Sequence, residues 1–139
     1  MERKRKSSVL VAIDGSEYSD KAFQYACKLS LSKKIPLLIL NVVEEYVTTG
    51  YSILKELKNS SKEMLHKYRT RAELLGVPSV SSIQCVGNPA EEILKIANKN
   101  EIDTLIIGRR GKYGTSKDMI GGTSYKLVHY SKCTVTIVK

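Results

Sequence analysis

The chain has 139 residues, of which 42% are hydrophobic and 27% are charged, and that length can bury one hydrophobic core without disulfides or metals. The composition excludes a disordered chain, a collagen-like repeat and a small disulfide-stabilised domain. The formal net charge of +9 favours anionic partners such as nucleotides, nucleic acid or acidic surfaces. The alternative is that the lysines only solvate helix faces, which would account for much of the excess positive charge.

The apolar segments are too short to cross a membrane. The longest, residues 35–43, is interrupted by Pro36 and Asn41 and falls far short of the roughly 20 residues that a spanning helix needs. No apolar signal-peptide region with a cleavage site follows the basic residues 2–6. We therefore expect a soluble cytoplasmic protein that has no membrane partner.

The three cysteines are an odd number, widely spaced, and form no Cys-x-x-Cys pair. They are Cys27, Cys85 and Cys133, and each has apolar residues close to it in the sequence. This pattern is typical of buried reduced thiols in a reducing compartment.

The first part of the chain predicts a strand, a helix and a second strand. Residues 8–13 are a continuous apolar run, typical of a strand buried on both faces of a parallel sheet. From Glu17 onward apolar residues recur every three or four positions, which predicts a helix with Ser16 as its N-cap. Pro36 interrupts the helix pattern, and residues 37–43 form the second predicted strand.

The middle of the chain predicts a loop, a long helix and an edge strand. Residues 44–52 have no clear period and are expected to form the loop. Apolar positions at helical spacing between residues 53 and 75 predict a lysine-rich helix that ends at Gly76. The alternation over residues 80–86 predicts a third strand near a sheet edge.

The last part of the chain begins with a strong helix start. Asn88 can cap a helix whose first turn contains Pro89. A fourth strand is predicted over residues 103–107, a helix over 121–130 and a fifth strand over 134–138.

Strands that alternate with helices predict a parallel sheet with right-handed crossovers and helices on both faces. We expect one open, doubly wound α/β domain with a five-stranded sheet over residues 8–139. Residues 1–7 are expected to form a basic N-terminal tail.

Two glycine clusters mark a candidate ligand site, because open parallel sheets bind ligands beyond the carboxyl ends of their strands. Gly108 and Gly111 follow the fourth predicted strand, and Gly121 and Gly122 open the next helix. Glycines let backbone amides approach a ligand closely, and a helix N-terminus favours anions. The basic residues between the clusters are Arg109, Arg110, Lys112 and Lys117. This arrangement predicts phosphate binding; the alternative is that the glycines only form tight turns.

The sequence resembles the universal stress protein family at this motif. Its ATP-binding members carry G-x-x-G, nine residues and then Gly-[Ser/Thr], and Gly108, Gly111 and Gly121 match that spacing. Three other segments resemble the family's first strand and turn, the start of its third helix and its last strand: residues 9–16, 86–93 and 133–138. The resemblance covers essentially the whole chain.

The resemblance implies an open sheet in the order 3-2-1-4-5 and a homodimer formed through the C-terminal strand. It also implies that Ala12, Asp14 and Val42 hold adenine and ribose, although Asp14 could instead only cap its turn. The nucleoside would lie against Ile107 and Gly108. The phosphates would lie along Arg109, Gly111, Gly121, Gly122, Thr123 and Ser124.

The chain departs from the family pattern at Gly122, which stands where the family has Ser or Thr. The loss of one neutral hydrogen bond costs on the order of 1 kcal/mol, about fivefold to tenfold in affinity. Thr123 and Ser124 follow directly and could supply hydroxyls.

No catalytic constellation is evident in the sequence. His66 and His129 fall within predicted helices without an adjacent nucleophile, so a structural or solvated role is expected for both. Asp14 and Asp118 could hold Mg²⁺ on a bound nucleotide. Any activity would be at most slow hydrolysis of bound ATP.

Three functions from different classes follow from these observations. The first is an ATP-binding regulatory protein of the stress response, in which ATP orders the 108–124 segment and changes a surface that a protein partner recognises. The second is a dimeric interaction protein of the same fold that binds no nucleotide, as Gly122 would favour. The third, nucleic-acid binding through residues 3–6 and the lysine-rich helix faces, is disfavoured because no aromatic residues flank the basic cluster.

Overall fold

The computed structural model describes residues 7–45, 50–99, 101–109 and 121–139. Along these residues strands and helices alternate in the predicted order: β1 (Ser8–Ala12), α1 (Glu17–Lys33), β2 (Leu37–Glu44), α2 (Tyr51–Leu74), β3 (Val80–Gly87), α3 (Pro89–Lys99), β4 (Ile102–Gly108), α4 (Gly122–Tyr130) and β5 (Thr134–Val138). No helix among them is long and apolar enough to span a membrane. The basic residues 1–6 of the predicted tail lie outside the described residues.

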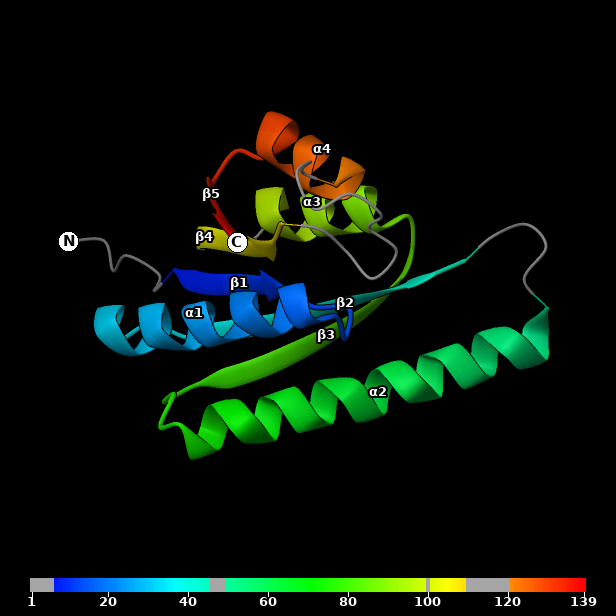
Figure 1. Ribbon diagram of the computed structural model, residues 1–139, viewed down its shortest axis with the longest axis horizontal. Coiled ribbons are helices and arrows are strands. Elements are labelled where there is room, and N and C mark those ends of the chain that lie inside the picture. Colours follow the sequence, from blue (N-terminus) through cyan, green and yellow to red (C-terminus); the bar gives the residue numbers. More distant parts are fainter. Residues whose placement is uncertain (1–6, 46–49, 100, 110–120) are drawn as a thin grey trace.

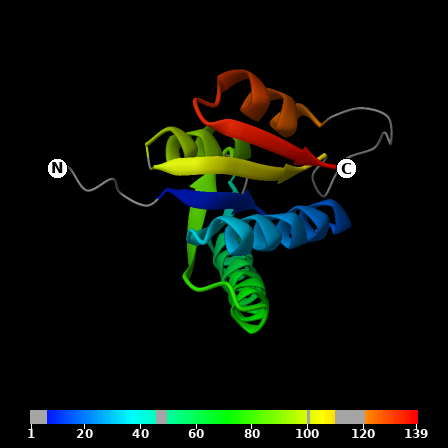
Figure 2. The same cartoon turned by 90° about the vertical axis from the view of Figure 1, so that its left-hand side faces the viewer.

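The strands form one parallel sheet in the order β3-β2-β1-β4-β5, which confirms the predicted fold. Helices α1 and α2 cover one face of the sheet and α3 and α4 cover the other (Figures 1 and 2). The order reverses between β1 and β4, since the chain moves outward to β2 and β3 on one side and to β4 and β5 on the other. A ligand site is expected at this reversal.

Each face of the sheet carries its own hydrophobic core. Side chains alternate along β1, so Val9 and Val11 pack under α1 and α2, whereas Leu10 packs on the α3 and α4 side. All three are fully buried. Burial on both faces explains why β1 is continuously apolar rather than alternating.

Two predicted helix starts are confirmed by their caps. The Ser16 hydroxyl accepts a hydrogen bond from the backbone N–H of Ser19 at 3.2 Å, at the start of α1. The Asn88 side-chain oxygen accepts one from the N–H of Glu91 at 3.1 Å, at the start of α3. Each cap satisfies an amide that has no partner within its helix.

The apolar positions that predicted α2 are not buried along its whole length. Tyr68 is buried, but Ile53 and Leu75 are each 57% exposed. Leu75 lies just beyond the last helical residue, where the chain turns away at Gly76 with a φ of +93°. Ile53 lies at the start of α2, whose buried residues all come from Ser61 onward. The first turns of α2 therefore project past the core (Figure 1).

All three cysteines are free, as predicted, but they are not equally buried. Cys27 is 1% exposed, and its burial raises the pKa of its thiol to about 11. Cys85 and Cys133 are only partly buried, because each lies on or next to an edge strand. The expectation of complete burial was therefore wrong for these two residues.

Candidate functional site

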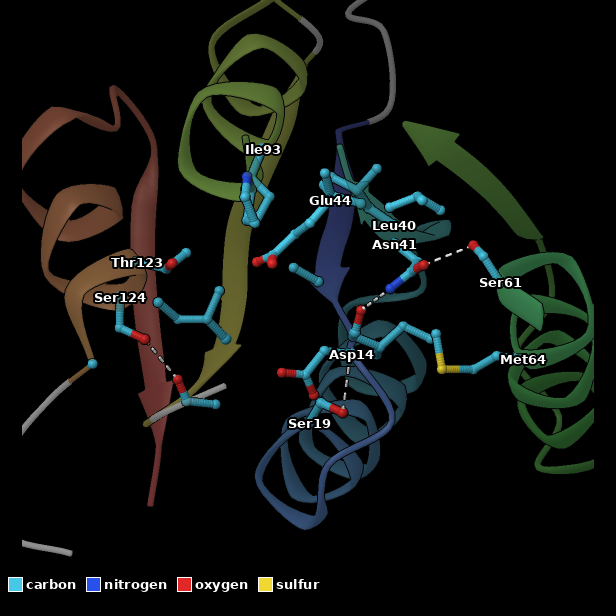
Figure 3. A pocket seen from close by; sticks show the side chains of 18 of the residues that line it. Asp14, Ser19, Leu40, Asn41, Glu44, Ser61, Met64, Ile93, Thr123 and Ser124 are labelled. Atoms are coloured by element: carbon cyan, nitrogen blue, oxygen red, sulfur yellow. Dashed lines mark hydrogen bonds between the residues drawn. The ribbon is translucent and has the colours of Figure 1, made fainter. Parts of the chain in front are cut away.

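A cavity of about 720 Å³ opens at the carboxyl ends of β1, β2 and β4. It lies where the strand order reverses, as expected for a parallel sheet. Residues of α2 form one wall, and residues of α3 and the start of α4 form the opposite one (Figure 3). Its volume lies within the range of small-molecule sites.

Most of the candidate residues meet in this cavity. Those that line it are Ala12, Asp14, Val42, Ile107, Gly108, Gly121, Gly122, Thr123 and Ser124. Of the remaining two, Gly111 lies outside the described residues, and Arg109 does not contribute to the lining. Other residues of the predicted anion site also lie outside the described residues: Arg110, Lys112, Lys117 and Asp118.

Arg109 acts through its backbone in the described part of the site. Its carbonyl accepts a hydrogen bond from the Gly121 N–H at 3.1 Å, and its own N–H donates to the carbonyl of Val138 at 3.1 Å. Gly108 and Gly121 are thereby brought together beside the end of β5. This closure confirms that Gly108 and Gly121 face the same space, although twelve residues separate them.

Gly108 is a glycine for a steric reason. A Cβ atom at this position would lie 2.8 Å from the backbone oxygen of Tyr18 and 2.9 Å from its carbonyl carbon. The end of β4 can therefore approach the first turn of α1 only without a side chain. At Gly122, by contrast, an added Cβ atom would meet no described atom within 4 Å.

The N-terminus of α4 forms one end of the cavity. Its N-cap, Gly121, supplies no side-chain hydrogen bond. The amides of Gly122, Thr123 and Ser124 belong to the first turn, whose N–H groups have no partner within the helix. Such a turn favours negative charge through its amides and the helix dipole.

Ser124 has a role that the sequence did not predict. It is 5% exposed, and its hydroxyl donates a hydrogen bond to the carbonyl of Gly108 at 3.0 Å. This bond holds the start of α4 against the end of β4 (Figure 3). The hydroxyl proton is thus used in a hydrogen bond within the protein. The backbone amide of Ser124 belongs to the first turn of α4.

Asp14 both lines the cavity and holds its own turn. Its carboxylate accepts a hydrogen bond from the N–H of Ser16 at 2.9 Å, while its N–H donates to the hydroxyl of Ser19 at 3.3 Å. The two interpretations of Asp14, as a ligand contact and as a turn cap, are therefore compatible.

A buried polar pair in the lining of the cavity was not predicted from the sequence. The Asn41 amide nitrogen donates to the carbonyl of Ile13 at 2.6 Å, and the Ser61 hydroxyl donates to the Asn41 side-chain oxygen at 2.7 Å (Figure 3). Asn41 is 6% exposed and Ser61 is 4% exposed. These bonds tie α2 to β2 and to the residue that precedes Asp14. The one signal in the sequence was a polar residue within an apolar strand.

Most of the remaining lining is apolar, with one further carboxylate and the hydroxyl-bearing residues Ser19 and Ser60. Ile53, Leu57 and Met64 of α2 face Ile93 of α3, and Glu44 lies at the end of β2. None of the described lining residues is a lysine or arginine. An apolar space suits a base or another flat ring, and the first turn of α4 is the described part of the lining best suited to an anion.

Comparison with known proteins agrees with this architecture. The model of the "Universal stress protein family" matches residues 7–139. The chain is 33% identical to the universal stress protein YxiE of Bacillus subtilis over 147 aligned positions, which cover 96% of this chain and 99% of that protein.

Solved structures show the same fold. The universal stress protein UspA from Lactobacillus plantarum superposes with a TM-score of 0.88 at 20% identity, covering 99% of this chain and 100% of that one. A universal stress protein family protein from Arabidopsis thaliana with AMP bound gives a TM-score of 0.68 at 20% identity, with 96% and 91% covered. On the family match and the similarity to YxiE, the chain belongs to the universal stress protein family.

Proposed function

We propose that this chain binds ATP in the cavity at the strand-order reversal and acts as a nucleotide-dependent regulatory protein of the stress response. The observation that carries the proposal is the convergence of Gly108, Gly121 and the first turn of α4 on one cavity. Structures of other family members contain AMP, cAMP and dAMP, which supports an adenine nucleotide as the ligand class.

The residues present fit such a nucleotide. Adenine would occupy the apolar part of the cavity beside Val42 and Ile107, and the Asp14 carboxylate would accept hydrogen bonds from ribose hydroxyls. The phosphates, which carry the charge, would lie at the first turn of α4 near Thr123. Asp14 is also the described carboxylate of the predicted Mg²⁺ pair, whose other member is Asp118.

Direct nucleotide analysis tests the proposal. The purified protein is denatured and its supernatant chromatographed, and stripped protein is then titrated with ATP, ADP and AMP by calorimetry, with and without Mg²⁺. Co-purified ATP or a micromolar dissociation constant would support the proposal. The absence of detectable binding of all three nucleotides at millimolar concentration would contradict it.

A matched pair of substitutions tests whether the cavity is the site. Ser60 lines the cavity and is exposed on α2, whereas the neighbouring Asn59 is exposed and does not line it. Ser60→Trp is expected to fill the cavity and weaken ATP binding at least about tenfold, which corresponds to about 1.4 kcal/mol. Asn59→Trp is expected to leave affinity unchanged. Equal effects of the two would place the nucleotide elsewhere.

Gly122→Ser is expected to strengthen ATP binding. It restores the hydroxyl that the family motif carries, and an added Cβ atom has open space at this position. One neutral hydrogen bond contributes about 1 kcal/mol, or about fivefold to tenfold in affinity. Calorimetry compares this variant with Gly122→Ala, which adds the carbon without the oxygen. Equal affinities of the two variants would show that no hydroxyl is needed there.

The second candidate function is a homodimeric interaction protein that uses no nucleotide. It is favoured by Gly122 and by β5, which ends the sheet and has the uncharged sequence Thr-Val-Thr-Ile-Val. Pairing of β5 with a second copy would cover its unpaired backbone groups. Light scattering after gel filtration would test the dimer, and a dimer without nucleotide affinity would favour this candidate.

A further inference from the structure

A second groove lies at the opposite end of the sheet from β5. It has a volume of about 230 Å³ and runs between α2 and β3. β3 is the strand that ends the sheet on that side (Figure 1). Its lining residues are Lys62, Leu65, His66, Arg69, Ser82 and Gln84. No residue of the proposed nucleotide cavity takes part in it.

The backbone of β3 presents an open edge to this groove. Leu37 of β2 pairs with Val80, and its N–H donates to the carbonyl of Ser79. In a parallel ladder this register directs the odd-numbered residues of β3 toward β2 and the N–H and C=O groups of even-numbered residues outward. Ser82 and Gln84, which line the groove, therefore carry outward-facing backbone groups. Among the described strands none pairs with this side of β3.

β3 lacks the features that usually protect an edge strand. Its sequence, Val-Ser-Ser-Ile-Gln-Cys-Val-Gly, contains no lysine, no other charge and no proline. Natural sheets blunt an exposed edge with such residues or cover it with another element. α2 packs on one face of β3, and the Gln84 side chain donates to the carbonyl of Lys58 at 2.7 Å. That bond anchors the helix beside the edge.

The helix side of the groove is basic. Lys62, His66 and Arg69 follow one another at spacings of four and three residues, so they share one face of α2. Arg69 also contacts Glu73, with 3.3 Å between Nε and Oε1, but both side chains are about half exposed, and such surface pairs contribute little. The row therefore still attracts carboxylates.

The step from Lys62 to His66 matches an extended chain, and the step from His66 to Arg69 is about 2 Å shorter. Four residues of helix rise about 6 Å and three rise about 4.5 Å, whereas two residues of strand span about 6.6 Å. Side chains on one face of an added strand recur every two residues. Carboxylates at alternate positions of such a strand would therefore stand close to successive basic residues of α2.

We propose that the β3 edge and the basic row formed by Lys62, His66 and Arg69 dock an acidic, extended protein segment. The segment adds to the sheet as a further strand, with hydrogen bonds to the outward backbone groups of Ser82 and Gln84. These main-chain bonds supply affinity, and carboxylates at every second position supply specificity. The site is independent of nucleotide binding and would remain if that function failed.

The experiment uses the full-length, nucleotide-stripped protein and a fluorescent peptide with glutamate at every second position and threonine between. A peptide of the same composition with its glutamates clustered at one end is the control probe. Fluorescence polarisation is expected to show binding of the alternating peptide and at least about tenfold weaker binding of the clustered one, since only the first matches the spacing of the row.

Two sets of variants separate docking from general charge attraction. Lys62→Glu with Arg69→Glu is expected to weaken binding at least about tenfold. The control, Lys55→Glu with Lys99→Glu, makes the same change in net charge at exposed positions of α2 and α3 that do not line the groove. It is expected to weaken binding less than about twofold, because exposed charges at a distance are screened by salt.

The backbone component has its own test. Ser82→Pro removes an outward N–H but no bond to β2, a position at which an edge strand tolerates proline, and it is expected to abolish binding. If this variant loses its native circular dichroism, a probe that is N-methylated at alternate residues replaces it and is expected not to bind. No binding of the alternating peptide, equal effects of the two charge-reversed variants, or undiminished binding without the backbone donors would each overturn the proposal. Competition by a single-stranded oligonucleotide that survives Ser82→Pro would identify a nucleic-acid surface instead.

Discussion

Gly108→Ala is expected to destabilise the protein by about 2–3 kcal/mol, because overpacking of a close backbone contact has effects of this size. The added methyl group would lie 2.8 Å from the carbonyl oxygen of Tyr18 and 2.9 Å from the carbonyl carbon. Neither atom belongs to a flexible side chain, so β4 and α1 must separate. The Ser124 hydroxyl bonds to the Gly108 carbonyl, and the movement would therefore also displace the start of α4.

Urea denaturation measures the loss of stability, and calorimetry measures the loss of ATP affinity that the displacement should cause. Gly122→Ala is the matched control within the same motif, since its methyl group meets no described atom within 4 Å. It is expected to change stability by no more than about 0.5 kcal/mol, as is usual for a surface substitution. If the two variants were equally stable, the close approach at Gly108 would not hold in solution.

Asn41→Leu is expected to destabilise the protein by about 3 kcal/mol. The substitution keeps the side chain's approximate size but leaves the Ile13 carbonyl and the Ser61 hydroxyl buried without their present partner. An unsatisfied buried polar group costs about 1–3 kcal/mol. The carbonyl of Ile13 directly precedes Asp14, so the ligand-facing turn should also lose its fixed position.

A double-mutant cycle isolates this network. Ser61→Ala alone removes one hydrogen bond and is expected to cost about 1 kcal/mol. In the presence of Asn41→Leu it should cost less, because the hydroxyl that it removes is then already unsatisfied, with a coupling of about 1 kcal/mol. Urea denaturation of the four proteins gives the coupling. Additive effects within about 0.3 kcal/mol would show that the two side chains act independently.

The order of elements was predictable because its signals are local. The continuous apolar run of β1, the Ser16 cap and the Asn88-Pro89 start each lie within a few residues of the structure that they specify. The spacing of the glycine motif likewise predicted that Gly108 and Gly121 share a site. Strand order itself came from the family resemblance, since it depends on contacts between distant segments.

The parts of the site that were not predicted depend on such distant contacts. Asn41 and Ser61 are twenty residues apart, and nothing near either one shows that they meet. The use of the Ser124 hydroxyl by Gly108 depends on how α4 lies against β4. The periodicity between residues 53 and 75 predicted the helix, but it did not show that Ile53 lies beyond the part of α2 that is buried.

Because its burial is uneven, α2 is anchored to the core along its second half only. Its second half is fixed by buried residues such as Leu65 and Ala72, whereas Ile53 and Leu57 near its free end are 57% and 43% exposed above the cavity. A molecule in the cavity would support the free end from below and stiffen it, which amide hydrogen exchange would register as protection. Occupancy could then be communicated to the surface as a change in rigidity, with the shape of the helix left as it was.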